Sequence, residues 1–425
     1  MSCFFICTVY RGRHFFNKFV RFLTNADMKH FFKLMTAVIL SIFCLASCQQ
    51  NETRAKYIFL FIGDGMGATH VAVTESYLSH KAGKLGGEQL LMTQFPHYGM
   101  ATTHSANRNI TCSSAAGTAI ACGEKANNST VGINKDSVEI ESVAYALKKD
   151  GYKIGIMSTV PINHATPSAF YAHNISRSNT YEISSEIPES GFDFFAGAGF
   201  LEYNGKNGDQ EPTDSYLERN GYSVSYGMEE FRRESAGKDK VVFCQASNRN
   251  ESADNYVSDG TVEADASMAE MLGLALEFLG DEEPFFIMGE GGAIDWAAHD
   301  NRTMSTIENV LDFDAAIKVA YEFYQKHPDQ TLIVVTADHE TGGLTLGCGS
   351  STVKWDKLEQ QWIESGKKNT LNSEENRKLN ESCSIGWTTG SHTGGAVPVY
   401  AIGAGAERFC GRMDNTDIKG KILGE

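Results

Sequence analysis

The sequence predicts an α/β protein with a doubly wound, mostly parallel central sheet and helices on both faces. From Tyr57 onward, short apolar strands alternate with amphipathic helical stretches, a pattern typical of this class. The chain has 425 residues, of which 42% are apolar, so it can bury a sizeable core. No internal repeat or low-complexity tract interrupts the alternation.

The strands and helices are expected in a definite order. The first strand covers residues 56–62 and ends at Gly63. A helix over 138–149 stops at Gly151, where a residue that tolerates a left-handed backbone commonly follows a helix. The remaining elements are a strand at 152–157, a strand at 285–288, a helix at about 305–326, and strands at 331–335 and 397–402.

Two stretches break this rhythm and are interpreted as inserts that leave the sheet within a single domain of residues 48–425. The first covers about 182–258 and is rich in Gly, Asn and charge. The second, about 348–383, is polar and helical. It lies between Cys348 and Cys383, which are our first choice for a disulfide among the six cysteines that follow Cys48.

The N-terminus, residues 1–47, is interpreted as a leader whose true start is Met28. Basic residues precede an apolar run at 34–45, which is too short to span a membrane and is typical of a secretory signal. Its Leu-Ala-Ser-Cys ending resembles the lipobox of bacterial lipoproteins. The resemblance implies export and a lipid on Cys48, with the protein held on the periplasmic face or at the outer membrane. A buried core helix is the less favoured alternative for 34–45.

Charge argues against a nucleic-acid partner. The formal net charge is −16, and the leader is basic, so the rest of the chain is more acidic still. An acidic surface repels a phosphate backbone. We therefore expect no nucleic acid to bind.

Carboxylates and imidazoles follow the predicted strands, where ligands bind in open parallel sheets. Asp64 follows the first strand, Glu290 and Asp295 follow 285–288, and Asp338 and His339 follow 331–335. These five side chains should meet at one edge of the sheet. Packed together they would leave uncompensated charge unless cations were present, so the sequence predicts a metal centre.

Helical spacing and a glycine-flanked histidine add further ligand candidates. Asp295 and His299 lie four residues apart, which places both on one face of a helix. His392, in Gly-Ser-His-Thr-Gly, is a third candidate. Taken singly, each of these residues has an alternative structural interpretation: Asp64 as a turn residue, Asp338 as a helix cap, and each histidine as an ordinary core or surface residue. The Gly-Asp-Gly-Met-Gly segment lacks the spacing of a dinucleotide loop.

Ser114 lies in a run of small residues, 111–119, that is typical of a helix N-terminus, where amide groups favour a developing anion. The serine is a candidate nucleophile, with a helix cap as the commoner use of such a residue. Arg177 is a candidate phosphate ligand, because its planar fork can bind two oxygens.

At this point the motifs resemble those of the alkaline phosphatase family, in the family's order and over residues 57–405. They are Ile-Gly-Asp-Gly-Met-Gly, Ser-Ser-Ala-Ala-Gly-Thr-Ala, His-Ala-Thr-Pro, Glu-Gly-Gly-Ala-Ile-Asp-Trp-Ala-Ala-His, Thr-Ala-Asp-His-Glu-Thr-Gly-Gly and Ser-His-Thr-Gly. The resemblance implies hydrolysis of phosphate monoesters through a phosphoserine on Ser114, with release of inorganic phosphate. Members are often dimers, which leaves a homodimer open here.

The resemblance also implies three metal sites. One Zn²⁺ would be held by Asp295, His299 and His392. The other ligand sets it implies are Asp64, Asp338 and His339 for a second Zn²⁺, and Asp64, Thr166 and Glu290 for a third ion, usually Mg²⁺. Two zinc ions would clamp the attacking and leaving oxygens.

The phosphate pocket departs from the family pattern at three positions. Ser113 stands where many members have an aspartate that orients the arginine, so we expect looser phosphate binding and faster product release. His164 and Trp296 occupy positions that are Asp and Lys in some members. Each is interpreted either as a substrate-pocket residue or as packing, and His164 leaves the identity of the third metal open, because imidazole suits zinc or cobalt better than magnesium.

Other activities are less well supported. Related phosphodiesterases usually lack the third site that Thr166 and Glu290 would build, and Cys112 does not lie in a sulfatase motif. A surface lipoprotein with a decayed catalytic centre is the alternative from another class, and an intact ligand set argues against it.

Overall fold

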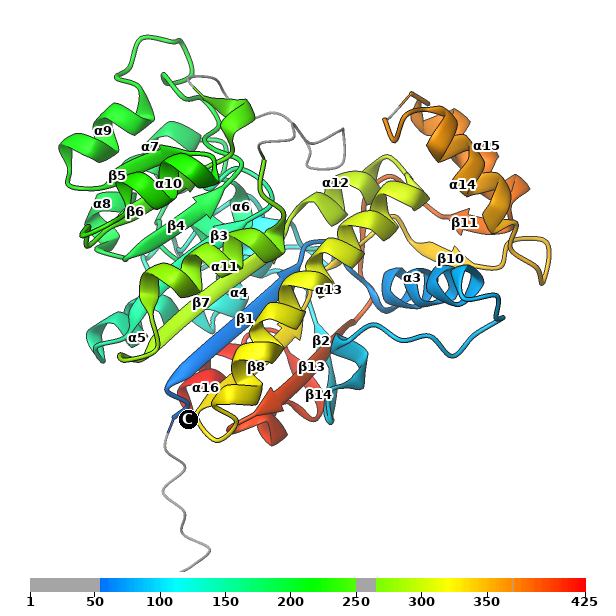
Figure 1. The fold of residues 1–425 in the computed structure, drawn as a ribbon, viewed down its shortest axis with the longest axis horizontal. Coiled ribbons are helices and arrows are strands. Elements are labelled where there is room, and N and C mark those ends of the chain that lie inside the picture. The colour runs from blue at the N-terminus through cyan, green and yellow to red at the C-terminus, as the bar shows by residue number, and fades with distance from the viewer. Residues whose placement is uncertain (1–53, 250–264, 369) are drawn as a thin grey trace, which may run out of the picture. The chain divides into compact units, whose positions relative to one another are not determined.

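The computed structural model describes residues 54–249, 265–368 and 370–425, and its centre is a 10-stranded sheet (Figure 1). In spatial order its strands are β14 (Gly411–Asp414), β2 (His97–Thr102), β13 (Val397–Gly403), β8 (Thr331–Thr336), β1 (Tyr57–Gly63), β7 (Phe285–Gly291), β3 (Lys153–Ser158), β4 (Phe194–Gly197), β6 (Val241–Cys244) and β5 (Ser223–Tyr226). Two short pairs lie outside it: β9 (Glu340–Thr341) with β12 (His392–Thr393), and β10 (Leu344–Leu346) with β11 (Ile385–Trp387).

Helices connect the strands. In chain order they are α3 (Ala68–Lys81), α4 (Ser113–Cys122), α5 (Val143–Lys149), α6 (Ala165–Ser168), α7 (Thr180–Ser185), α8 (Ile187–Ser190), α9 (Thr213–Arg219), α10 (Met228–Glu234), α11 (Met268–Leu279), α12 (Ala293–His299), α13 (Thr303–Lys326), α14 (Trp355–Glu364), α15 (Ser373–Ser382) and α16 (Asp417–Leu423).

The predicted fold class is confirmed. Every neighbouring pair in the large sheet is parallel except the two that involve β13, which runs antiparallel to β2 and β8. Helices α11 and α13 contact each other and cover β1, β3, β7 and β8 on one face, while α4, α5 and α16 lie on the other (Figure 1). Both faces are therefore covered, as parallel sheets require.

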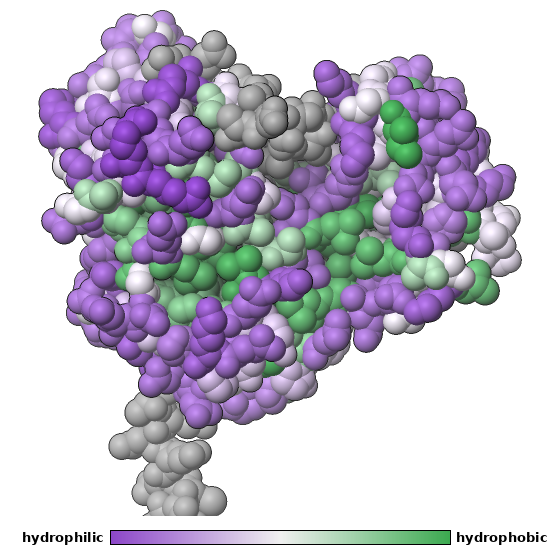
Figure 2. Space-filling view, in the orientation of Figure 1, coloured by the Kyte–Doolittle hydropathy of each residue, from purple (hydrophilic) through white to green (hydrophobic). Residues whose placement is uncertain are grey.

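The core lies around the central strands. All seven residues of β1 are buried, because a central parallel strand is covered by helices on both sides. Helix α13 buries Ile307, Val310, Phe313 and Ile317, a three-to-four-residue spacing that keeps one stripe on the sheet. Figure 2 shows apolar residues gathered over α11 and the neighbouring part of α13, framed by hydrophilic residues.

The strand register determines where polar side chains emerge. Ile62 of β1 lies opposite Glu290 of β7 and Thr336 of β8, and Ser158 of β3 also lies opposite Glu290. The carboxyl ends of four adjacent strands therefore share one edge. The loops that follow them, with α12, carry the predicted polar residues.

Two expectations about secondary structure need correction, and the expectation about the leader concerns residues outside the described part of the chain. The helix predicted at 138–149 begins only at Val143, where Ser142 caps it through its side chain. The described part of the predicted insert at 182–258, residues 182–249, does not leave the sheet: β4, β5 and β6 extend it at one edge. The alternation is hard to see there because these strands have four residues each. The leader, with Met28, residues 34–45 and Cys48, lies outside the described residues.

The second insert is helical, as predicted, and packs on its own apolar cluster. Trp355 and Trp362 of α14 are buried with Trp387 of β11 and Met304 of α13. The Cys348–Cys383 disulfide is not formed: within the described residues all six cysteines are free. Among the described residues, no helix combines the length and the apolarity needed to span a membrane.

Candidate metal centre and nucleophile

The predicted ligands meet at the carboxyl edge of the sheet. Asp64 follows β1, Asp338 and His339 follow β8, and Glu290 lies within β7. Three groups of side chains could each hold a metal ion, because the ligand atoms within each group lie within 4.8 Å of one another. The groups are Asp64 with Asp338 and His339, Asp295 with His339 and His392, and Asp64 with His164 and Glu290.

Backbone carbonyls orient two of the histidines. His299 donates a hydrogen bond from Nδ1 to Gly390 O at 2.8 Å, and His392 donates from Nδ1 to Thr111 O at 2.9 Å. Because Nδ1 of each ring carries the proton that is donated, Nε2 is the nitrogen left to bind a metal. The two Nε2 atoms lie 3.1 Å apart, and Asp295 oxygens lie 3.3 Å and 3.5 Å from them. Three candidate metal ligands thus converge on one point.

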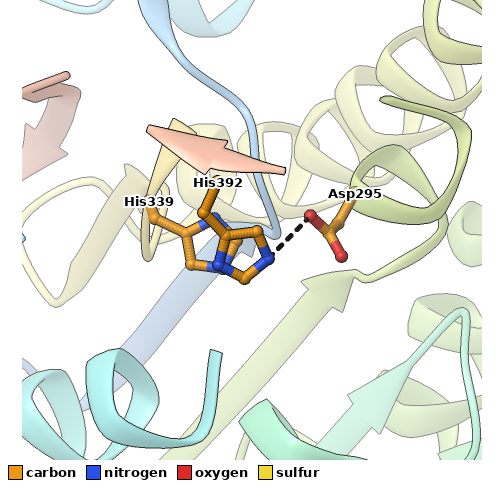
Figure 3. A group of neighbouring side chains, drawn as sticks. All are labelled: Asp295, His339 and His392. Carbon is orange, nitrogen blue, oxygen red and sulfur yellow. Dashed lines mark ion pairs between the residues drawn. The ribbon is translucent and has the colours of Figure 1, made fainter. Parts of the chain in front are cut away.

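His339 is oriented in the same way. Thr341 donates through Oγ1 to Asp295 Oδ1 at 2.5 Å and lies 3.2 Å from Nδ1 of His339. Because its proton goes to Asp295, Thr341 accepts from His339 Nδ1, and Nε2 again carries a lone pair. Figure 3 shows the His339 and His392 rings stacked beside Asp295, with ring centroids 3.6 Å apart. Imidazoles whose second nitrogen is held by a hydrogen bond in this way are typical of metal ligands.

Several buried oxygens at this edge have no hydrogen-bond partner among the described residues. They are Oδ1 and Oδ2 of Asp64, Oδ2 of Asp338, Oε1 of Glu290 and Oγ1 of Thr166. Nε2 of His339 lies 3.3 Å from Asp64 and 3.2 Å from Asp338. Unsatisfied buried acceptors are costly, so the donor set fits divalent cations.

The ionisation of these carboxyl groups reflects the same crowding. Burial, and then the charges of neighbouring carboxylates, raise the pKa of Asp64 and of Asp338 well above the ordinary value. Burial raises the pKa of Glu290 to about 7, although its hydrogen bond from Ser158 opposes the rise. Protons therefore occupy the place of cations in the metal-free protein.

Asp295 and His299 form the one strongly ionised pair. The hydrogen bond to Asp295 raises the pKa of His299 to about 9, against the effect of burial. Burial would raise the pKa of Asp295, but its hydrogen bond to His299 and the nearby imidazoles hold it below the ordinary value. This carboxylate is thus the anionic centre of the cluster.

Arg177 and His164 lie beside the cluster and contact each other. Arg177 donates through Nη2 to Nε2 of His164 at 3.0 Å, and the Trp296 ring meets His164 edge-on with centroids 5.4 Å apart. Burial and the charge of Arg177 lower the pKa of His164 to about 3. The His164 imidazole is therefore neutral. It gives the Arg177 guanidinium a hydrogen-bond partner, although residue 113 is a serine and not an aspartate.

Ser114 is in the first turn of α4, as predicted, and is fully buried. Its Oγ lies 3.3 Å from Sγ of Cys112, the N-cap residue. The Oγ of Ser113 lies 3.3 Å from Nε2 of His339. A side chain at Gly117 would come within 3.3 Å of Thr166, so this glycine lets α4 and α6 pack closely.

The structure thus brings the predicted residues together, with one difference in grouping. His339, expected only at the second site, also lies within reach of Asp295 and His392. Sequence reasoning missed Thr341, Cys112 and the carbonyls of Gly390 and Thr111. Thr341 stands two residues after a predicted ligand, within the motif Thr-Ala-Asp-His-Glu-Thr-Gly-Gly, which could have indicated it.

Comparison with known proteins agrees with this geometry. The profile of the family described as Alkaline phosphatase matches residues 55–197 and 250–423. Alkaline phosphatase 4 of Bacillus subtilis is 32% identical, covering 87% of this chain and 88% of its own.

Solved structures resemble the fold. The alkaline phosphatase of the Antarctic bacterium TAB5 is 32% identical with a TM-score of 0.70, covering 87% of this chain and 97% of that one. A variant of it, with a histidine replaced by glutamate and Mg bound in the M3 site, is 30% identical with a TM-score of 0.69 over the same shares.

We predict that the metal-free protein loses stability as the pH rises from about 6.5 to 9. The folded-state pKa of His299 is about 9, above its ordinary 6.5, so its contribution is complete below 6.5 and is lost as the pH passes through 9. The raised pKa values of Asp64 and Asp338 act in the same direction. The pKa values of His164, His339 and His392 are lowered, so these groups change the stability only below pH 6.5.

Thermal unfolding of chelator-treated protein across this range measures the effect. Over this pH range, His299→Gln should reduce the loss in the free energy of unfolding by about 1 kcal/mol, once solvent screening of the partly exposed imidazole is allowed for. Zinc should abolish the slope, because a cation then occupies the position of the proton. Equal slopes in the wild type and His299→Gln would contradict the assignment.

Proposed function

The chain belongs to the alkaline phosphatase family, and from this premise we propose that it hydrolyses phosphate monoesters through a phosphoserine intermediate on Ser114. The observation that carries the proposal is the convergence of oriented imidazole Nε2 atoms and unpartnered carboxylate oxygens, which the segment that begins α4 and carries that serine contacts through Thr111 and Ser113. The ester would enter with its phosphoryl group toward this cluster, and inorganic phosphate would leave.

Two zinc ions are the proposed resident cofactors of the cluster. Asp295, His299 and His392 would hold one, with the mixed carboxylate and imidazole ligands that zinc accepts. The second would be held by Asp64, Asp338 and His339. When bound, such a pair stabilises the attacking and leaving oxygens of an in-line displacement.

For the third site we propose an oxygen donor set of Asp64, Thr166 and Glu290. His164 lies close enough to be a ligand there, but Nε2 of its ring accepts from Arg177. A neutral imidazole that accepts at Nε2 carries its proton on Nδ1, and so cannot ligate through Nδ1. The remaining oxygens suit Mg²⁺, the ion in the M3 site of the TAB5 variant.

The chain's own groups would carry out the remaining steps. Arg177 would bind two phosphoryl oxygens, with His164 fixing its guanidinium and Trp296 bracing His164. The Ser114 hydroxyl loses its proton, its oxygen bonds to phosphorus, the ester P–O bond breaks, and the alcohol leaves with a proton. Water then attacks the phosphoserine and frees phosphate. The positive end of α4 favours the extra negative charge.

Ser114→Ala should reduce phosphomonoesterase activity at alkaline pH by about a thousandfold or more, because the covalent route is removed. Hydrolysis of a chromogenic phosphate ester measures this. The metal content should stay unchanged, since no carboxylate or imidazole is altered. A variant that keeps wild-type turnover would refute the nucleophile assignment, whereas metal binding without turnover in the wild type would favour a binding protein.

Cys112 and Ser129 connect the nucleophile to the phosphate-binding arginine. Besides contacting Ser114, Cys112 Sγ accepts the Ser129 N–H at 3.1 Å, and Arg177 N–H donates to Ser129 O at 2.7 Å. Ser129 has a left-handed backbone, φ 76°, which these bonds help to hold. We therefore propose Cys112 as a positioning residue.

Cys112→Ala should lower kcat by about three- to tenfold, the effect of one lost hydrogen bond, and should raise KM because Arg177 is less fixed. Cys112→Ser should recover most of both, since a hydroxyl can accept from Ser129. Steady-state kinetics of the two variants, with metal content as the control, separate positioning from folding damage. Equal losses in both variants would argue against the role.

We propose that Cys48 carries a lipid anchor and that the protein is exported, on the basis of the leader sequence alone. In a bacterial host, the full chain should fractionate with membranes and incorporate labelled palmitate. Cys48→Ser should appear in the aqueous fraction without label and with unchanged specific activity. Membrane association that survives this substitution would exclude the anchor.

A further inference from the structure

A small cavity lies between the first turn of α13 and the insert helices α14 and α15. Its volume is about 20 Å³, slightly more than one water-sized sphere needs. It therefore has room for a single small occupant. Polyatomic oxyanions such as phosphate are too large for it.

The first turn of α13 forms one wall. This helix has 24 residues, and its N-cap residue, Arg302, provides no side-chain cap. The N–H groups of Thr303, Met304 and Ser305 have no acceptor among the described residues, and all three residues line the cavity. The positive end of a long helix thus faces the space with unpaired donors.

Two buried side chains on the walls also lack partners. Nε1 of Trp362 and Oγ of Ser305 form no hydrogen bond within the described residues, although Trp362 is only 6% exposed and Ser305 1%. An indole nitrogen can only donate. Leaving such a donor unpaired costs about 1–3 kcal/mol, so an acceptor in the cavity would be stabilising.

The charges on the walls favour an anion over water. Arg302 and Lys368 line the cavity, and no Asp or Glu does among the described residues. Arg302 also pairs with Asp300, outside the walls. Acceptors are few, because Oδ1 of Asn380 already accepts from Thr303. Asn376 donates from Nδ2 to Leu371 O at 3.2 Å, which leaves Gln361 as an amide that can turn either end inward.

We infer that this cavity binds one halide ion, chloride in ordinary media, held by the first turn of α13 and the Trp362 indole. The bound ion would link the insert to the loop that follows His299. Asn380 already donates to Asn301 O in this loop at 2.7 Å, and Thr303 donates to Asn380 at 2.8 Å. Halide binding should therefore stabilise the fold, whichever reaction the protein catalyses.

Thermal unfolding of the full chain tests this, with sodium chloride or bromide replacing sodium acetate at constant ionic strength. The wild type should gain roughly 2–4 °C, saturating with halide concentration, because a ligand of the folded state stabilises by mass action. Trp362→Phe keeps the ring but removes the donor, and should lose most of this gain. Trp355→Phe, a buried tryptophan of the same helix outside the walls, should keep it.

Crystals soaked in sodium bromide give a second, independent readout. An anomalous peak between Trp362 and the first turn of α13 is expected. Equal unfolding temperatures in halide and acetate, an equal gain in Trp362→Phe, or no bromide peak in the cavity would each overturn the inference and leave water as the occupant. If Trp362→Phe proves unstable in acetate as well, the wild-type titration and the bromide map still decide.

Discussion

The crowding of negative and lone-pair acceptors at one edge of the sheet is the constraint on which the rest of the active centre depends. Asp64, Asp338 and Glu290 present unpartnered oxygens in a buried space. His299 and His392 bring their Nε2 atoms to within 3.1 Å of each other. Such a cluster is unfavourable without positive charge. Protons relieve it in the metal-free protein, and divalent cations would relieve it better.

The fold supports this crowding through backbone placement. Parallel strands align their carboxyl ends, so that ligands from β1, β7 and β8 arrive together. At Gly65, with φ 70°, a Cβ would lie 2.8 Å from Thr341 Oγ1 and 2.9 Å from Asp295 Oδ1. This glycine leaves room for the Thr341–Asp295 hydrogen bond, and Gly117 likewise lets α4 approach Thr166. Small residues therefore set the distances within the centre.

Much of this could be predicted from the sequence, because local patterns determine it. Long apolar strands such as β1 and β8 are visible as runs, and Asp295 and His299 lie on one helix face by spacing alone. The four-residue strands β4, β5 and β6 were missed, since long-range pairing stabilises them. The Arg177–His164 contact and the carbonyls that orient His299 and His392 were also missed, because tertiary packing alone creates them.

The most direct test of the account is anomalous diffraction at the zinc edge from crystals of the metal-loaded protein. Two zinc peaks are expected: one among Asp295, His299 and His392, and one among Asp64, Asp338 and His339. The third position, beside Asp64, Thr166 and Glu290, should hold a lighter ion without zinc signal. An active protein with no anomalous peak at either of the first two positions would contradict the account.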